Sequence, residues 1–361
     1  MSRTIFFFLL LALFPLHLIA GQKSEANEFN VEEYIMEHIL DSYGWHITDI
    51  GGHEVTIPLP VILFDHGKLV CFMSSKFHHG TAAYKGYAFG FTDKTAGKIV
   101  KLQEEHAGFT GTLDPDIDYN FNTSFFDISI SKNVCAILIS IFILCGIFLS
   151  VARTYKRNPN RAPKGMQNML EAVILFIRDE IAIPMIGKEK HRKYLPYLLT
   201  LFFFILVNNL LGLIPLFPGG ANVTGNIAVT LVLALITFFV VQFSSNKTYW
   251  KHIFNMPGVP LLLKLPIPIM PVIELFGLIT KPFVLMVRLF ANIMAGHIVI
   301  LGFLALIFIF GGINQYLGLA VAPVSVVFYI FMGLLELLVA FIQAYIFTIL
   351  TALYIGMAGE H

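Results

Sequence analysis

Charged residues are scarce in this chain of 361 amino acids. Lys, Arg, Asp and Glu make up only 13% of it, whereas 57% of its residues are hydrophobic and its mean hydropathy is +0.75. A soluble core of this length does not need so much apolar material, so most of the surface must face lipid. The composition therefore predicts a polytopic membrane protein. The net charge of +1 and the absence of a basic face give no support to a nucleic-acid partner.

Cysteine and the common catalytic motifs are also missing or rare. Of the three cysteines, Cys135 and Cys145 lie in one apolar segment and Cys71 stands alone in a polar region, so the soluble part has no disulfide framework. The adjacent His78 and His79 lack the spacing of metal ligands, and we expect neither a metal site nor a cofactor. There is no GxSxG elbow and no phosphate-binding loop, so the sequence predicts neither an enzyme nor an ATP-binding chain.

The N-terminus has the pattern of an export signal. Arg3 precedes the apolar stretch IFFFLLLALF, and the small residues Ala20 and Gly21 follow, which predicts a signal peptide over residues 1–20. If it is not cleaved, the segment anchors the chain in the same orientation. The polar region 21–130 then lies outside the cytoplasm, and its short alternating runs predict strands.

A spanning helix and an amphipathic helix are predicted next. Residues 133–151 are apolar over about the 20 residues that a bilayer requires, and basic residues follow at once, which predicts a cytoplasmic loop. The segment 165–186 is again followed by basic residues, so it does not simply cross the membrane. One helical stripe of this segment is apolar and predicts a helix lying in the interface, with Met166, Leu170, Val173, Ile174, Ile177 and Ile181 on the stripe.

Two further apolar segments, residues 197–214 and 223–243, are joined by the uncharged turn PLFPGGAN. They predict a helical hairpin with its tip outside. The next loop carries lysines and therefore returns the chain to the cytoplasmic side, and its many prolines delay the next helix.

The last two apolar segments are unusually long. Residues 271–311 would extend about 60 Å as a helix, against a hydrocarbon core of about 30 Å. They predict a continuous and strongly tilted helix, paired with a second one over residues 323–357 through an uncharged turn at 311–322. The alternative is a pair of ordinary hairpins, each broken at a glycine, for which Gly296 and Gly333 are suitable positions.

Polar residues of the first long helix fall on one line. Glu274, Lys281 and Arg288 are spaced by seven residues, so each is turned by only about 20° from the last. Arg288 is followed by many apolar residues, and a charge at this depth usually marks an ion path. Asn292 and Ala295 continue its surface with little bulk, which predicts that a partner helix approaches closely there.

Two titratable residues complete the polar set. His297 is nine residues from Arg288 and about half a turn round, so it should face a different neighbour. In the last helix Glu336, Ala340 and Gln343 share one stripe, and the buried carboxylate needs a donor or water. Residues of this kind at membrane depth are candidates for an ion pathway or for an interhelical hydrogen-bonded pair, and the two readings are compatible.

Several motifs resemble subunit a of F-type ATP synthases. They are VRLFANIMAGH around Arg288, LLVAFIQAYIFTILTALYIGMAGEH at the C-terminus, FFDISISKNV, VNNLLGLIP and, near residue 33, EYIMEHIL. The resemblance covers most of residues 125–361 and implies that 131–361 form a membrane domain of this type. Residues 40–125 depart from the family as an exported insertion.

The resemblance implies a stator subunit that provides two offset half-channels for proton translocation coupled to rotation of a c-ring. Arg288 would be the essential arginine facing the ring, Asn292 and Gln343 would support it, and Glu274 would line an ion pathway. The implied partners are the c-subunit ring, the b-subunit peripheral stalk and the remainder of the synthase. The implied location is a bacterial inner membrane, with the C-terminus in the cytoplasm.

His297 and Glu336 stand at the family's paired polar positions in an order reversed from many bacterial members, where the carboxylate comes first. They are therefore candidates for the outer pathway. The alternative function, a secondary ion transporter, should show repeated halves with matching helix breaks, and the sequence shows no such pattern.

Overall fold

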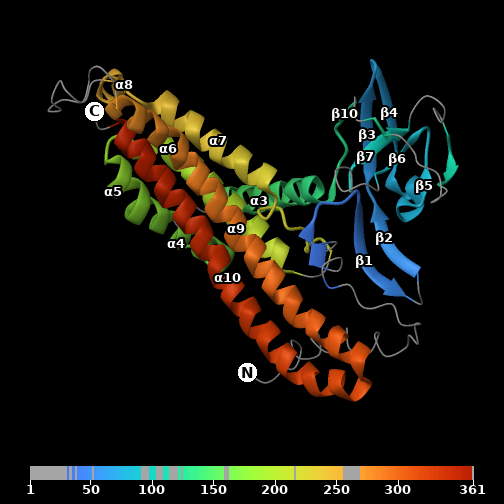
Figure 1. Ribbon diagram of the computed structural model, residues 1–361. Coiled ribbons are helices and arrows are strands. Elements are labelled where there is room, and N and C mark those ends of the chain that lie inside the picture. Colours follow the sequence, from blue (N-terminus) through green and yellow to red (C-terminus); the bar gives the residue numbers. More distant parts are fainter. Residues whose placement is uncertain are drawn as a thin grey trace.

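The computed structural model is described over most of the chain after its N-terminal thirty residues: 31, 35–36, 39–50, 53–90, 97–102, 109–113, 121–122, 125–157, 162–214, 217–254 and 269–359. The predicted signal peptide lies outside these residues. Within them, a β-domain precedes a group of long helices (Figure 1).

Among the described residues, five helices are long and apolar enough to cross a membrane: α3 (Lys132–Arg157), α6 (His191–Leu213), α7 (Ile227–Ser244), α9 (Ile269–Ile313) and α10 (Gln315–Gly359). The prediction of a helical, polytopic membrane protein is thereby confirmed. A short helix, α8 (Lys247–Phe254), follows α7 on its way to α9. The proline-rich segment after α8 lies outside the described residues.

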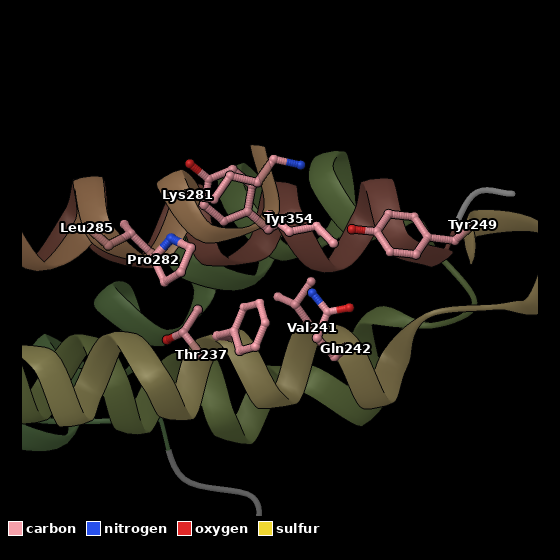
Figure 2. A pocket seen from close by; sticks show the side chains of 10 residues that line it. Thr237, Val241, Gln242, Tyr249, Lys281, Pro282, Leu285 and Tyr354 are labelled. Atoms are coloured by element: carbon pink, nitrogen blue, oxygen red, sulfur yellow. The ribbon is translucent and has the colours of Figure 1, made fainter. Parts of the chain in front are cut away.

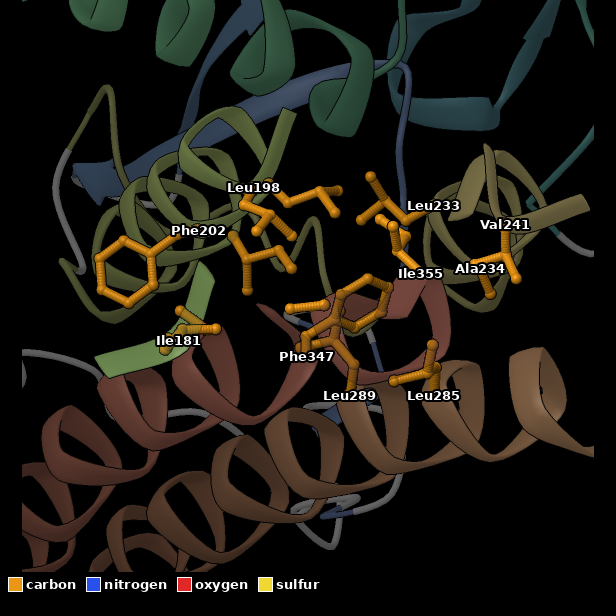
Figure 3. Close-up of a cluster of buried hydrophobic side chains, with 14 of the residues drawn as sticks. Ile181, Leu198, Phe202, Leu233, Ala234, Val241, Leu285, Leu289, Phe347 and Ile355 are labelled. Carbon is orange, nitrogen blue, oxygen red and sulfur yellow. The ribbon is translucent and has the colours of Figure 1, made fainter. Parts of the chain in front are cut away.

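The helices α9 and α10 lie side by side as an antiparallel pair, drawn in orange and red in Figure 1. Helix α6 packs against α10, α7 packs against α9 and α10, and α3 packs against α6. Their shared core is apolar and fully enclosed (Figure 3), with Leu198, Phe202, Leu233, Leu285, Leu289, Phe347 and Ile355 among its members. This core fixes which face of α9 points away from the other helices.

Each long helix is continuous over 45 residues, or about 68 Å. Gly296 and Gly333 lie inside helices, so the alternative of two glycine-broken hairpins is wrong. The predicted turn over residues 311–322 is also wrong, because α10 begins at Gln315 and Pro323 lies inside it. The physical reason is Asn314, whose side chain accepts a hydrogen bond from the Tyr316 amide (2.9 Å) and starts the helix at once.

The predicted amphipathic segment is helical but contains a wide turn. It comprises α4 (Met166–Phe176), a π-helical turn η4 (Ile177–Ala182) and α5 (Ile183–Ile186). Pro184 lacks a backbone N–H and cannot continue the regular ladder, which accounts for the wide turn before it. On the predicted stripe, Leu170, Ile177 and Ile181 are buried, whereas Met166, the first residue of α4, is exposed.

The hairpin of α6 and α7 differs from its prediction at two helix starts. Helix α6 begins at His191, six residues early, and includes Pro196. Helix α7 begins at Ile227 rather than at residue 223, because the Asn226 side chain accepts a hydrogen bond from the Ala228 amide (2.9 Å) and caps the helix. The residues before Asn226 therefore belong to the loop between α6 and α7.

The β-domain is built from short antiparallel strands, as the alternating runs predict. The strands are β1 (Gly44–Ile50), β2 (His53–Pro58), β3 (Pro60–Asp65), β4 (Lys68–Met73), β5 (Ala82–Ala83), β6 (Tyr87–Phe89), β7 (Ile99–Leu102), β8 (Gly111–Thr112), β9 (Phe121–Asn122) and β10 (Phe126–Asp127). The sheet orders are β1-β2, β10-β3-β4, β5-β8 and β6-β7-β9. A 3-10 helix, η2 (Ser74–Gly80), follows β4. The core beneath these strands contains Val61, Leu63, Phe77, Tyr87 and Ile99.

A buried carboxylate ties two of these sheets together. Asp65 of β3 forms an ion pair with Lys101 of β7 and accepts a hydrogen bond from the Tyr87 hydroxyl (2.9 Å). The hydrogen bond from Lys101 holds the pKa of Asp65 below its usual range, although burial opposes this shift. Burial, helped by Asp65, raises the pKa of Tyr87 to about 12.

The β-domain is fastened to the helices at two places. Asp41 accepts hydrogen bonds from the Ser131 hydroxyl (2.7 Å) and the Asn133 amide (3.0 Å), and thereby caps the start of α3. Trp45 of β1 stacks edge-on against Phe217 in the α6–α7 loop, with 5.1 Å between ring centroids. The Trp45 side chain is only 3% exposed, in a small core that also contains Ala136, Ala221 and Val223.

Candidate functional site

Arg288 faces away from the helical core. Its neighbours Leu285 and Leu289 on α9 are each 1% exposed and point into the core, as Figure 3 shows, whereas Arg288 itself is exposed. Among the described residues, the ion pairs do not include Arg288. Arg288 is thus a permanently charged guanidinium on an apolar helix, and it has no carboxylate partner in the described part of the chain.

The side chains around Arg288 are small. Ala291, Asn292 and Ala295 are exposed on the same side of α9, and none of them carries a long side chain. Small residues of this kind allow the backbone of a neighbouring helix to approach closely. The partner helix expected beside Arg288 and Asn292 stays a prediction.

The structure brings His297 and Glu336 together across the long hairpin. Nδ1 of His297 on α9 lies 2.9 Å from Oε1 of Glu336 on α10, and the glutamate side chain is only 3% exposed. Neither carboxylate oxygen has a partner of good hydrogen-bond geometry among the described residues. The carboxylate is thus close to a titratable ring and still has capacity to accept hydrogen bonds from water.

Gly296 makes room for this pair. A Cβ atom on Gly296 would lie 2.9 Å from both Cδ and Oε1 of Glu336, which real Cβ atoms essentially never do. On the other side of the ring, a Cβ on Gly212 of α6 would lie 3.5 Å from Nε2 of His297. His297 therefore sits between α6 and α10, about half a turn away from Arg288, as its spacing predicts.

A polar network beside the pair was not predicted. Asn209 of α6 donates a hydrogen bond to the Ala340 carbonyl of α10 (3.2 Å) and accepts one from the Thr224 hydroxyl in the loop before α7 (2.6 Å). Asn209 and Thr224 are both buried. The adjacent amides Asn208 and Asn209 inside an apolar span were the available signal, but Thr224 is recruited only by the fold of the loop.

Gln343 lies on the buried stripe of α10 together with Glu336 and Ala340, as predicted. Contacts along the hairpin fix its antiparallel register: His297 pairs with Glu336, and the Lys281 ammonium lies over the Tyr354 ring at 5.5 Å from its centroid. Gln343 falls between these two levels and is therefore close in height to the turn of α9 that carries Arg288 and Asn292.

Glu274 is distant from His297 and Glu336. It is half-buried near the start of α9 and acts electrostatically on the Tyr249 hydroxyl of α8. Burial raises the pKa of Tyr249, and the Glu274 carboxylate adds to this shift, whereas a hydrogen bond with Gln242 opposes it. Glu274 thus belongs to a second group of polar residues at the other end of the site.

A pocket adjoins this second group (Figure 2). It lies between α7, α8, α9 and α10, and its walls include Gln242, Tyr249, Lys281 and Tyr354. Oε1 of Gln242 is buried and has no hydrogen-bond partner among the described residues. The other lining residues are largely apolar.

The two polar groups lie on opposite sides of Arg288 along α9. Glu274 precedes Arg288 by fourteen residues, or about 21 Å, and His297 follows it by nine residues, or about 14 Å. We call them the Glu274 group (Glu274, Tyr249, Gln242 and Lys281) and the His297 group (His297, Glu336, Asn209 and Thr224). Within the described part of the chain, no cluster of His, Cys, Asp and Glu has the arrangement of a metal site.

The chain matches two family models. Residues 134–356 match the model described as ATP synthase A chain, and residues 34–128 match a domain of unknown function (DUF8433). The chain is 47% identical over 241 residues to ATP synthase subunit a of Chloroherpeton thalassium, covering 65% of this chain and 68% of that protein. It is 46% identical over 312 residues to the subunit of Chlorobium phaeobacteroides strain DSM 266, covering 82% and 85%. Its identity to the Myxococcus xanthus subunit is 44% over 245 residues, covering 65% and 75%.

Proposed function

The chain belongs to the family of ATP synthase A chains, and we propose that Arg288 separates two offset half-channels through which protons reach and leave a ring of c subunits. Membership makes the chain a non-catalytic, ion-translocating subunit of the membrane part of an F-type ATP synthase. It takes part in ATP synthesis and proton transport as a multi-pass membrane protein, in a complex with the remainder of the synthase.

The position of Arg288 between the two polar groups is the observation that carries the proposal. A ring carboxylate that is protonated is neutral and can face lipid, whereas its ionised form needs a cation or water. The exposed guanidinium of Arg288 supplies that cation. Because Arg288 stays protonated, it favours ionisation of the passing carboxylate and does not itself carry the transported proton.

The His297 group provides the outer half-channel. The His297 imidazole lies beside a carboxylate that retains acceptor capacity, and imidazole groups can both receive and release protons. Asn209 and Thr224 extend this polar path toward the loop between α6 and α7. Asn292 supports Arg288 from the next turn of α9. Gln343 supports it from α10, at about the same height.

The Glu274 group provides the inner half-channel. The pocket lined by Gln242, Tyr249 and Lys281 lies at the end of α9 that follows the lysine-bearing loop, which the positive-inside rule assigns to the cytoplasm. Since about 35 Å of helix separates Glu274 from His297, a proton passes between the two paths only when the ring turns. A membrane potential drives this turn with about 2.3 kcal/mol per charge per 100 mV.

The same charge pattern sets the orientation. The β-domain lies outside the cytoplasm of a bacterial inner membrane, and the C-terminus lies in the cytoplasm. The exposed face of α9 meets the c-ring, and the b-subunit peripheral stalk holds the chain stationary against rotation. These partners follow from the family, and the unpartnered Arg288 surface supports the first of them.

Replacement of Arg288 tests the proposal. Synthase with Arg288→Ala should assemble and retain ATP hydrolysis but lose ATP-driven proton pumping. Arg288→Lys should fail largely as well, because an ammonium is more strongly hydrated and shifts its pKa readily when buried. Arg178→Ala, on the exposed side of η4, is the matched control and should pump normally. Normal coupled pumping in Arg288→Ala would refute the assigned role.

A further inference from the structure

The three-stranded sheet β10-β3-β4 has one face in the core of the β-domain and one face open. Val61 and Leu63 of β3 are fully buried on the inner face. On the opposite face, the side chains alternate with them and are also apolar. We call this the outer sheet face, and it consists of Phe64, Leu69, Cys71, Met73, Phe126 and Ile128.

These residues form continuous rows across the strands. Phe64 pairs with Phe126 on one side and with Leu69 on the other, and the next row contains Ile128 and Cys71 around Ile62. Their exposure is high: 75% for Phe126, 63% for Leu69 and 62% for Ile128. Scattered exposed apolar residues are common on soluble proteins, but neighbouring rows of them are not.

An antiparallel sheet with one face in water normally alternates apolar and polar residues along each strand. Strand β3 carries no polar side chain at its outward positions, because Ile62 and Phe64 lie between the inward Val61, Leu63 and Asp65. Strand β10 has the same pattern. Its polar residue Asp127 points away from the outward face and accepts a hydrogen bond from the Tyr43 hydroxyl (2.5 Å). The outer sheet face is therefore built for contact with something apolar.

The chain itself places this face close to the membrane. Lys132, where α3 begins, is only four positions after Ile128, so at most about 14 Å of chain joins them. The Asp41 cap on α3 and the contact of Trp45 with Phe217 hold the β-domain against the helices at the same end. Figure 1 shows β10 running down toward α3. The interfacial layer of a bilayer is itself about 5–8 Å thick on each side.

From these observations we infer that the outer sheet face rests on the outer surface of the lipid bilayer, with Phe126, Leu69 and Ile128 inserted among the headgroups. The face then continues the lipid-exposed side of α3, whose Val134, Leu138 and Phe142 are exposed as well. Aromatic and aliphatic side chains at this depth bury apolar area without crossing the hydrocarbon, as interfacial anchors do.

A fluorescent label on the native Cys71 tests this inference directly. The complete synthase carries Cys135→Ala and Cys145→Ala in this subunit and no cysteine in its other subunits, and it is reconstituted in vesicles of phosphatidylcholine and phosphatidylglycerol. The label is quenched either by lipids with a nitroxide near the headgroup or by aqueous iodide. The matched control moves the label to the exposed Lys98→Cys on the same domain, in a Cys71→Ala background.

We expect lipid nitroxide to quench the Cys71 label about twofold or more beyond the Lys98 control, and iodide to show the reverse order. A label at Leu69→Cys, in the next row of the same face, must give the same result. Equal quenching at Cys71 and Lys98 by both agents would overturn the inference. It would also be overturned by a Cys71 label that neither agent reaches in the synthase, since protein rather than lipid would then cover the face.

Discussion

Replacing Gly296 by alanine should impair proton conduction although alanine is the better helix former. In an ordinary helix interior, Gly→Ala stabilises by about 0.5–1 kcal/mol. Here the new Cβ would lie 2.9 Å from Cδ and Oε1 of Glu336, so the carboxylate must move away from His297. Gly296→Ala should therefore lower proton conductance if conduction needs the His297–Glu336 contact, and should leave it unchanged if it does not.

The size of the effect follows from the contact that is lost. The contact between Nδ1 of His297 and Oε1 of Glu336 is short but lacks good hydrogen-bond geometry, so we assign it about 1.5 kcal/mol, the lower end of the range for a hydrogen bond to a charged group. Since about 1.4 kcal/mol corresponds to a factor of ten, the paired arrangement should become about tenfold less populated. Passive proton conductance through the outer half-channel should fall by about tenfold or more if the pair is on the path.

The assay is passive proton conductance of vesicles that contain the membrane part of the synthase, measured with a pH-sensitive dye. Gly302→Ala is the matched control, because it lies in the same helix and its Cβ would meet nothing within 4 Å. Once Glu336→Ala has vacated the space, adding Gly296→Ala should cause no further loss. Unchanged conductance in Gly296→Ala, or an equal loss in Gly302→Ala, would refute the reasoning.

Three further expectations concern other parts of the molecule. Single His297→Ala and Glu336→Ala variants should each slow pumping, and the exchange His297→Glu with Glu336→His should restore part of it; losses that simply add, without recovery, would show that the two act independently. Lys98→Cys should label from outside and Lys251→Cys from the cytoplasm in cells, and the opposite pattern would refute the proposed orientation. The pKa of Asp65 is lowered in the folded chain, so its contribution to β-domain stability is present above the unfolded pKa of about 3.9 and is lost as pH falls through the folded pKa. Lys101→Met removes the partner of Asp65 and should therefore unfold at a higher pH than the parent chain during acid titration. The transition is followed by Trp45 fluorescence in a Trp250→Phe background, and identical acid transitions would contradict the prediction.

What the sequence could predict were features that repeat at short range. Helical periodicity is enough to place Glu274, Lys281 and Arg288 on one line and to turn His297 toward another neighbour, and both placements agree with the structure. Segment length and charge were enough to predict the five apolar helices. The start of α10 was missed because a single side chain, Asn314, decides it, whereas the neighbouring glycines suggested a longer turn.

Features that depend on distant pairing could not be predicted. Thr224 reaches Asn209 only because the loop before α7 folds back over α6. Likewise, Phe64 and Phe126 are 62 positions apart in the chain, and only the strand order β10-β3-β4 makes them neighbours on one apolar face. The roles of Arg288 and of the two polar groups remain predictions that rest on placement and chemistry.

The Trp45 contact makes the β-domain and the membrane domain structurally dependent on each other. The two family matches end and begin only a few residues apart, at 128 and 134, as if one module had been appended to another. Yet Trp45 shares a core with Ala221 and Val223, which lie in the same loop as Thr224, the residue that donates a hydrogen bond to Asn209. Removal of the β-domain would uncover that loop. A relative without the domain should therefore carry different side chains at the positions of Ala221 and Val223.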